Sequence, residues 1–212
     1  MPSWNVHLEA GQRLANKLKL TGLERKEFLF ACLLPDINNG YINKVKVTKQ
    51  HEETHYTFSQ KSSLNFYAEN SEKIKKRDPI FLGYLFHLYT DGFFNYDFYR
   101  NIKRHKLGQN KTQEEKRAIK HNDFWLYDAE FNHTLGVKKT DLAHLAARAN
   151  EVSATEISPE DIEDVERIMR EGCLKDLIKG KKYQLYSKER LDNLMDDMIE
   201  SFTGDYLGDD HA

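Results

Sequence analysis

The sequence predicts an all-α protein, and three observations support this fold class. Only 4 Pro and 11 Gly occur among the 212 residues, and runs of β-branched residues are scarce. Apolar residues recur at helical spacing along most of the chain. Residues 80–89 are apolar nearly all round a helix, which predicts that this helix passes through the middle of the fold. We therefore expect a compact multi-helix fold around a central apolar helix.

The helices are predicted, in order, at residues 4–20, 23–34, 62–75, 79–105, 112–133, 139–150, 158–179 and 187–202. Ser3 suits the N-cap of the first helix, Thr21-Gly22 ends it, and the second stops before Pro35. Ser158-Pro159 starts the helix at 158–179, with acidic residues in its first turn. Residues 36–60 are polar and contain Asn38-Asn39-Gly40, so we expect a long loop with short extended pieces at Val45 to Val47. A loop of that length is usually functional.

Charge is divided unevenly along the chain. Residues 1–150 hold 24 Lys and Arg against 17 Asp and Glu, whereas residues 151–212 hold 8 against 17. We interpret 1–150 as a helical core and 151–212 as an acidic helical extension packed on the same domain. The extension either packs against the basic body or is a solvated helical cap.

The composition excludes several classes of protein. No segment approaches the roughly 20 apolar residues that span a bilayer, so we expect no membrane insertion. The first residues resemble no signal peptide, and the two cysteines, Cys32 and Cys173, lie far apart inside helical patterns. We expect reduced thiols and a cytoplasmic location, with a structural disulfide as the alternative. The chain carries no clear nucleic-acid signature.

His87 and Asp91 are the residues that point most directly to chemistry. They are four positions apart on the most apolar helix, so both project from one face, roughly 6 Å apart along the axis. An imidazole and a carboxylate at that spacing can bind one divalent ion, and mixed nitrogen and oxygen ligands suit zinc. The alternative is a hydrogen-bonded pair that satisfies two buried polar groups.

Other polar residues in apolar surroundings extend the metal interpretation. Asp36 follows Leu33-Leu34-Pro35, where it otherwise caps a turn, and His7 lies between Val6 and Leu8, where it is otherwise a core histidine. His55 follows Thr54, and the stretch from His51 to His55 superficially matches the HExxH motif of metalloproteases. That motif needs a helix, and the polar surroundings here argue against one.

Taken in order, His7, Leu-Leu-Pro-Asp36, Thr-His55 and His87-x-x-x-Asp91 resemble the ligand set of the zinc-dependent phospholipase C superfamily, specifically its small bacterial branch. That superfamily is related more distantly to fungal zinc-dependent single-strand nucleases. The resemblance covers about residues 3–130 and implies an all-helical fold. It also implies that Asp36, His55, His87 and Asp91 hold one zinc, that Asp91 bridges to a second zinc bound by His7, and that Asp36 acts as general base.

The chain departs from that family at several positions. Trp4 is internal here, whereas the secreted phospholipases bind zinc through the amino group of an N-terminal Trp, so we expect Trp4 to pack under the site. No histidine after Asp91 has Glu four residues later, as the family's third zinc site requires. Asp123 is the substitute ligand we consider, or a residue that orients a ligand, and the alternative is a solvated helix face.

Three functional hypotheses follow. The first is a zinc-dependent hydrolase of a small phosphate ester or phosphodiester, with the basic stretches 73–77 and 100–106 either attracting the anionic substrate or serving only as solvated helix ends. A phosphohydrolase of the His-Asp domain type ranks below it, because the chain has no His-Asp dipeptide. The third is a non-catalytic helical protein with a structural metal site, or a degenerate family member that acts as a binding module.

Overall fold

The computed structural model describes residues 3–42, 46–56, 62–171 and 178–208. The predicted all-α class is confirmed, because the protein is 70% helical and the described residues form no sheet, only an isolated bridge between Asn39 and Val47. The α-helices are α1 (Trp4–Lys17), α2 (Gly22–Ala31), α3 (Leu34–Ile37), α4 (His51–Thr54), α5 (Ser62–Lys75), α6 (Pro79–Arg104), α7 (Gln113–Asp128), α8 (Leu142–Ala149), α9 (Pro159–Glu171) and α11 (Lys188–Tyr206). Two short 3₁₀ helices follow α6 and precede α8, η1 (Lys106–Gly108) and η2 (Lys139–Asp141).

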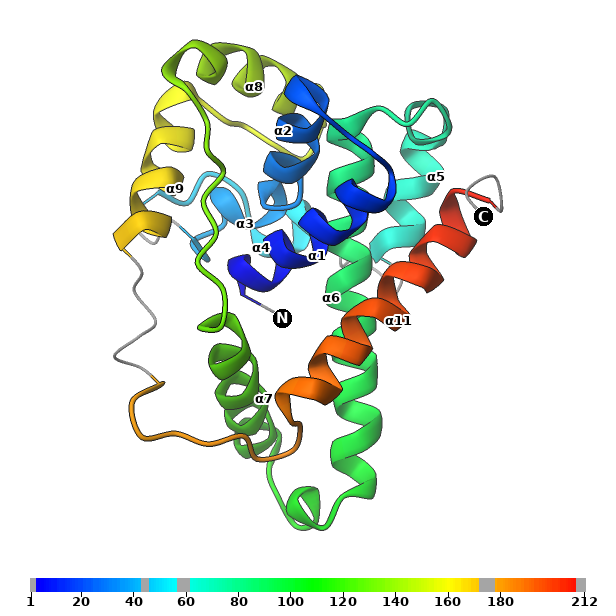
Figure 1. Ribbon diagram of the computed structural model, residues 1–212, viewed down its shortest axis with the longest axis vertical. Helices are drawn as coiled ribbons and strands as arrows, with labels where there is room; N and C mark the ends of the chain where they lie inside the picture. The colour runs from blue at the N-terminus through cyan, green and yellow to red at the C-terminus, as the bar shows by residue number, and fades with distance from the viewer. Residues whose placement is uncertain (1–2, 43–45, 57–61, 172–177, 209–212) are drawn as a thin grey trace.

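The long helix α6 is the axis of the molecule (Figure 1). Its first half packs against α2 and α5, and α1 and α11 cross it as well. Its side chains from Ile80 to Leu88 are buried without interruption, as the apolar run predicts. Asp78 caps the helix by accepting a hydrogen bond from the Ile80 amide, and Pro79 occupies its first turn.

Gly83 allows α2 to approach α6 closely. A Cβ atom at this position would lie 2.4 Å from the Phe28 carbonyl oxygen and 2.7 Å from the Ala31 Cβ. Neither neighbour is the flexible end of a side chain, so any larger residue would push the two helices apart. The close approach places the C-terminal end of α2 beside the first turns of α6.

The start of α1 is anchored to the end of α7 through Asp128. The Ser3 hydroxyl and the Asn5 amide, at 3.1 Å, donate to Oδ1 of Asp128, and Asn5 Nδ2 donates to Oδ2 at 3.1 Å. Burial raises the pKa of Asp128 to about 6, although the bonds from Asn5 lower it. This anchor sets the position of the first turns of α1, which carry Trp4 and His7.

The helix boundaries differ from the predictions at several points. The helix predicted at 23–34 ends earlier, at Ala31, and a separate short helix, α3, begins at Leu34 with Pro35 in its first turn. The long loop predicted at 36–60 contains α3 and α4, and Val47 pairs with Asn39 as a short extended piece, whereas Val45 lies outside the described residues. The helix at 112–133 ends at Asp128, and the last helix continues to Tyr206.

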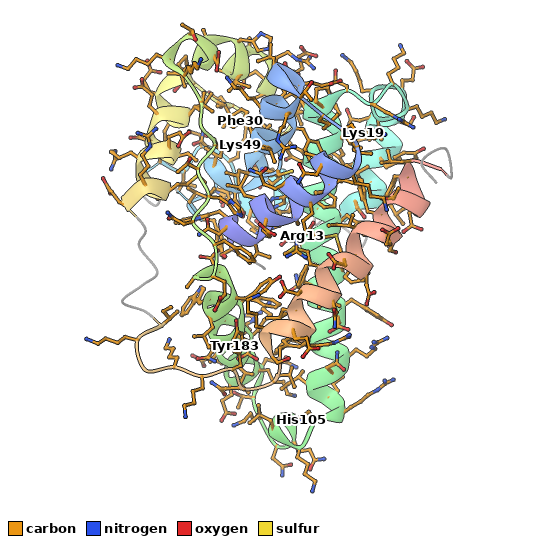
Figure 2. All side chains as sticks on the ribbon, in the orientation of Figure 1. Arg13, Lys19, Phe30, Lys49, His105 and Tyr183 are labelled. Atoms are coloured by element: carbon orange, nitrogen blue, oxygen red, sulfur yellow. The ribbon has the colours of Figure 1, made fainter. Side chains whose placement is uncertain are left out.

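The acidic extension contacts the basic body through ion pairs. Arg13 of α1, labelled in Figure 2, pairs with Asp192 of α11 at 3.2 Å and with Asp196 at 2.8 Å. Lys17 pairs with Glu200 of the same helix. These partly exposed pairs add little stability individually. The buried face of α11, from Leu191 to Phe202, holds it against α1 and α6.

Two further sequence-based expectations concern cysteines and membranes. Cys32 is buried and free, whereas Cys173 lies outside the described residues. Within the described part of the chain, every helix is too short or too polar to cross a bilayer.

Candidate metal centre

Four helices that are separate in the sequence bring five predicted ligand residues together in one buried cluster. His7 comes from α1, Asp36 from α3, His55 directly follows α4, and His87 and Asp91 lie one turn apart on α6. Their exposed fractions are 1%, 1%, 2%, 0% and 7%, respectively. A polar group buried this deeply needs partners. Here the partners are mainly the other members of the set.

His55 lies at the middle of the cluster. Its Nε2 is 3.4 Å from Asp36 Oδ1, 3.5 Å from Asp91 Oδ2 and 3.3 Å from His87 Nε2. His87 Nε2 is 3.9 Å from an oxygen of each carboxylate. Four ligands placed about 2.1 Å from a tetrahedral zinc ion lie about 3.4 Å from one another. The observed separations match a set of atoms around one common cation.

His7 approaches the same cluster from the other side of Asp91. Its Nε2 lies 3.3 Å from Asp91 Oδ1, whereas Asp91 Oδ2 faces His55 and His87. The rings of His7 and His87 are parallel, with centroids 3.9 Å apart. The two oxygens of Asp91 therefore face different imidazoles, and His7 also offers a ligand atom within 4.8 Å of Asp36 and His87.

Neighbouring groups orient two of the imidazoles. Nδ1 of His87 is 2.8 Å from the Cys32 carbonyl, which can only accept, so this nitrogen carries the proton and Nε2 presents a lone pair to the cluster. Thr54 Oγ1 lies 2.9 Å from Nδ1 of His55, and the Tyr84 hydroxyl donates to the Thr54 carbonyl. These contacts direct both Nε2 atoms inward.

Several atoms of the cluster are buried without a hydrogen-bond partner among the described residues. They are Asp36 Oδ2, Asp91 Oδ1 and both ring nitrogens of His7; the 3.3 Å approach of His7 Nε2 to Asp91 Oδ1 is a charge contact without hydrogen-bond geometry. An unpartnered carboxylate oxygen at such depth is costly, and a cation among these atoms would compensate it. The donor set of imidazole and carboxylate suits zinc, so the residues present fit the ion that the sequence resemblance implies.

The cluster separates the protonation states of its members. Burial, with His7 as neighbour, lowers the pKa of His87 to about 3, so this imidazole is neutral and ready to ligate. Burial also opposes the charge of His55, but the hydrogen bond and charge of Asp36 outweigh it and raise the pKa of His55. Burial acts to raise the pKa of Asp36 and Asp91, yet the neighbouring histidines outweigh it and lower both. Both carboxylates are therefore ionised.

Asp123 lies outside this cluster. It is fully buried on α7, and its oxygens accept from the backbone amides of Gln184, Leu185 and Tyr186 at 2.8 to 2.9 Å. Its Oδ1 also accepts from Asn122 Nδ2. The structure thus gives Asp123 the role of holding the segment before α11, and does not bring it among the other predicted ligands.

The later histidines also lie elsewhere. His133 pairs with Glu9 at 2.8 Å, His144 with Glu27 at 2.6 Å, and His105 is exposed near the end of α6 (Figure 2). His121 packs beside Trp125. In the described residues none of these joins a group of metal-ligating side chains.

His51 and Trp4 lie close in the sequence to two of the clustered histidines. His51 begins α4, so the stretch that was expected to be non-helical forms one helical turn, and its ring stacks on His55 at 3.9 Å. Trp4 is buried in the core near the start of α1. The sequence gives no signal for the Cys32 carbonyl, which is a backbone group, or for the bond from the Tyr84 hydroxyl to the Thr54 carbonyl, because Tyr84 lies in an apolar run far from Thr54 in the sequence.

Comparison of the chain with known protein families, curated proteins and solved structures finds no match.

Proposed function

We propose that this protein is a zinc-dependent hydrolase of a phosphate ester or phosphodiester. The observation that carries the proposal is the convergence of three imidazole Nε2 atoms and two ionised carboxylates, with buried carboxylate oxygens that lack partners. The ordered ligand pattern resembles that of the zinc-dependent phospholipase C superfamily, which supports the reaction class. The substrate is a small phosphorylated molecule.

Asp36, His55, His87 and Asp91 would hold one zinc ion, and His7 with Asp91 would hold a second. Zinc bound there would supply Lewis acidity for activating water and neutralising phosphate oxygens. Asp36 is ionised, with one oxygen bound to no described residue, so it would accept the proton of the attacking water. His87 is held in one tautomer by the Cys32 carbonyl and keeps its lone pair towards the ligand cluster.

A structural metal site is the second candidate, and the burial of the cluster favours it. Asp91 is the most exposed of the five residues, at only 7%. A substrate would have to reach the centre past this residue. A site closed to substrates stabilises the fold without catalysing a reaction, and removal of the metal then unfolds the protein.

Metal content of the purified protein tests the centre itself. We expect zinc-loaded protein to retain one to two ions, and His87→Ala and Asp91→Ala to retain substantially less because each removes a ligand. His105→Ala is the matched control, since this exposed histidine lies far along α6 from the cluster (Figure 2). Zinc content near zero in the parent, or equal zinc in His87→Ala and His105→Ala, would contradict the proposed centre.

Activity separates the two candidates once zinc is found. Hydrolysis of bis(p-nitrophenyl) phosphate should require zinc, stop with a chelator and fall at least about a hundredfold in Asp36→Asn, which removes both the general base and a charged zinc ligand. The Asn variant keeps the side-chain shape, so its helicity should match the parent. Bound zinc without hydrolysis, together with loss of helicity on chelation, would instead establish the structural role.

A further inference from the structure

Asn39 lies in the segment that joins α3 to α4, the two short helices that place Asp36 and His55. Its backbone pairs with Val47 in an antiparallel bridge, and its side-chain Oδ1 accepts a hydrogen bond from the Tyr41 amide at 3.0 Å. Neither contact involves a proposed metal ligand. The position of Asn39 is therefore set independently of the metal centre.

The side-chain nitrogen of Asn39 contacts both of these short helices. Nδ2 lies 2.8 Å from the Pro35 carbonyl oxygen and 3.4 Å from both Asp36 Oδ1 and Thr54 Oγ1. The Pro35 carbonyl can only accept and the Tyr41 amide can only donate, so these neighbours fix which end of the Asn39 amide is the nitrogen. One N–H donates to Pro35. The other is left for Asp36 and Thr54, which are equally distant, as in a three-centre hydrogen bond.

The hydroxyl of Thr54 connects this contact to His55. Thr54 is only 3% exposed, and its Oγ1 lies 3.3 Å from the His51 carbonyl oxygen and 2.9 Å from Nδ1 of His55. A hydroxyl has one proton and two lone pairs. The His51 carbonyl takes the proton, because otherwise two oxygens would face each other at 3.3 Å with no proton between them. The two lone pairs then accept from Asn39 Nδ2 and from Nδ1 of His55, which leaves the Nε2 lone pair of His55 for a cation in the cluster.

We propose that Asn39 is a positioning residue of the metal centre. Its amide ties Asp36 to Thr54 and, through the Thr54 hydroxyl, holds the His55 imidazole in the tautomer and orientation that ligation requires. A backbone carbonyl does the same for His87. The inference rests on the proposed metal centre, and it does not require that the centre hydrolyse a phosphate ester.

The zinc affinity of the full-length protein, measured by competition with a chromogenic chelator, tests the proposal. We expect Asn39→Ala to bind zinc about ten- to a hundredfold more weakly, as is typical when a group that orients a metal ligand is lost. Asn38→Ala is the matched control, because Asn38 is more deeply buried and its amide nitrogen donates to the Glu156 carbonyl and to Asp161, not to a ligand. It should lower the midpoint of urea unfolding at least as much as Asn39→Ala, yet keep the zinc affinity of the parent. If Asn39 only stabilised the fold, zinc affinity would follow stability in both variants.

Thr54 offers a second pair of variants that nearly preserves the shape of the site. Thr54→Val removes the hydroxyl and should weaken zinc binding, whereas Thr54→Ser keeps the hydroxyl and should bind zinc like the parent. The visible absorption of Co²⁺ bound in place of zinc reports the geometry of the ligands and not the stability of the fold. This spectrum should change in Asn39→Ala and Thr54→Val, and match the parent in Thr54→Ser.

The possible failures are distinguishable. Parent-like zinc affinity and Co²⁺ spectrum in Asn39→Ala would overturn the positioning role and leave the metal centre standing. Equal loss of zinc affinity in Thr54→Ser and Thr54→Val would overturn the connection through the hydroxyl. A parent protein that binds no zinc would overturn both the metal centre and the role of Asn39.

Discussion

Replacing Gly83 with Ala tests whether the close contact between α2 and α6 positions the proposed metal ligands. The new Cβ would lie 2.4 Å from the Phe28 carbonyl oxygen, and real Cβ contacts are not shorter than 3.0 Å, so the helices must separate by at least the difference. Overpacking of this kind costs about 1–3 kcal/mol. The higher helix propensity of Ala returns about 1 kcal/mol, which leaves a net loss of stability of about 1 kcal/mol.

The same displacement should reach the metal site. Cys32 follows α2 directly, and its carbonyl holds Nδ1 of His87 at 2.8 Å. Loss of a group that orients a metal-binding histidine typically lowers metal affinity about ten- to a hundredfold. We expect a reduction of that size in Gly83→Ala, measured by competition with a chromogenic zinc chelator, alongside a lower midpoint of urea unfolding.

Gly92→Ala is the matched control in the same helix. A Cβ at Gly92 meets no atom within 4 Å, so this variant should be as stable as the parent or more stable, by up to about 1 kcal/mol, with unchanged zinc affinity. If Gly83→Ala behaves like Gly92→Ala in both measurements, the helix contact does not position His87 and the reasoning fails.

Three further variants test other parts of the structure. Folding raises the pKa of Asp128 from 3.8 to about 6, so the protonated carboxyl favours the folded state. This contribution to the free energy of unfolding, roughly 3 kcal/mol, is present below pH 4 and is lost as the pH rises through 6. Urea unfolding of Asp128→Asn should lack this pH dependence. Asp123→Ala removes the acceptor of three backbone amides and should lower the free energy of unfolding by about 3 kcal/mol or more. The zinc content should not change; loss of zinc from the folded variant would instead make Asp123 a ligand. Tyr84→Phe leaves the Thr54 carbonyl without its donor and should lower stability by about 1 kcal/mol, with no change indicating that the bond is absent.

The fold class, and five of the polar residues that the structure brings together, could be picked out from local patterns in the sequence. The apolar run around His87 predicts a central helix, and the four-residue spacing of His87 and Asp91 predicts one helix face; both are properties of a single element. The structure also brings His7, Asp36 and His55 to that face. In the sequence His7 lies between two apolar residues, and Asp36 follows the apolar end of a helix.

The remaining features depend on contacts between distant segments. From the sequence alone, Gly83 is only a residue of low helix propensity, and its role appears when α2 packs against it. Glu166 belongs to a highly charged helix, so its burial is not evident from the sequence. Asp123 is the clearest case, because its environment is set by amides about sixty residues later, which no periodicity around Asp123 indicates. The short helix α4 was missed because a single turn is too brief to show a period.

The order of the ligands along the chain has a consequence for biosynthesis. All five lie between α1 and the middle of α6, and none is contributed by α7, α8, α9 or α11. A ribosome therefore delivers the complete set of ligands while the later helices are still untranslated. The proposed ligands on α3, α4 and α6 can therefore come together at that stage, whereas His7 takes its place only after α7 supplies its anchor, Asp128.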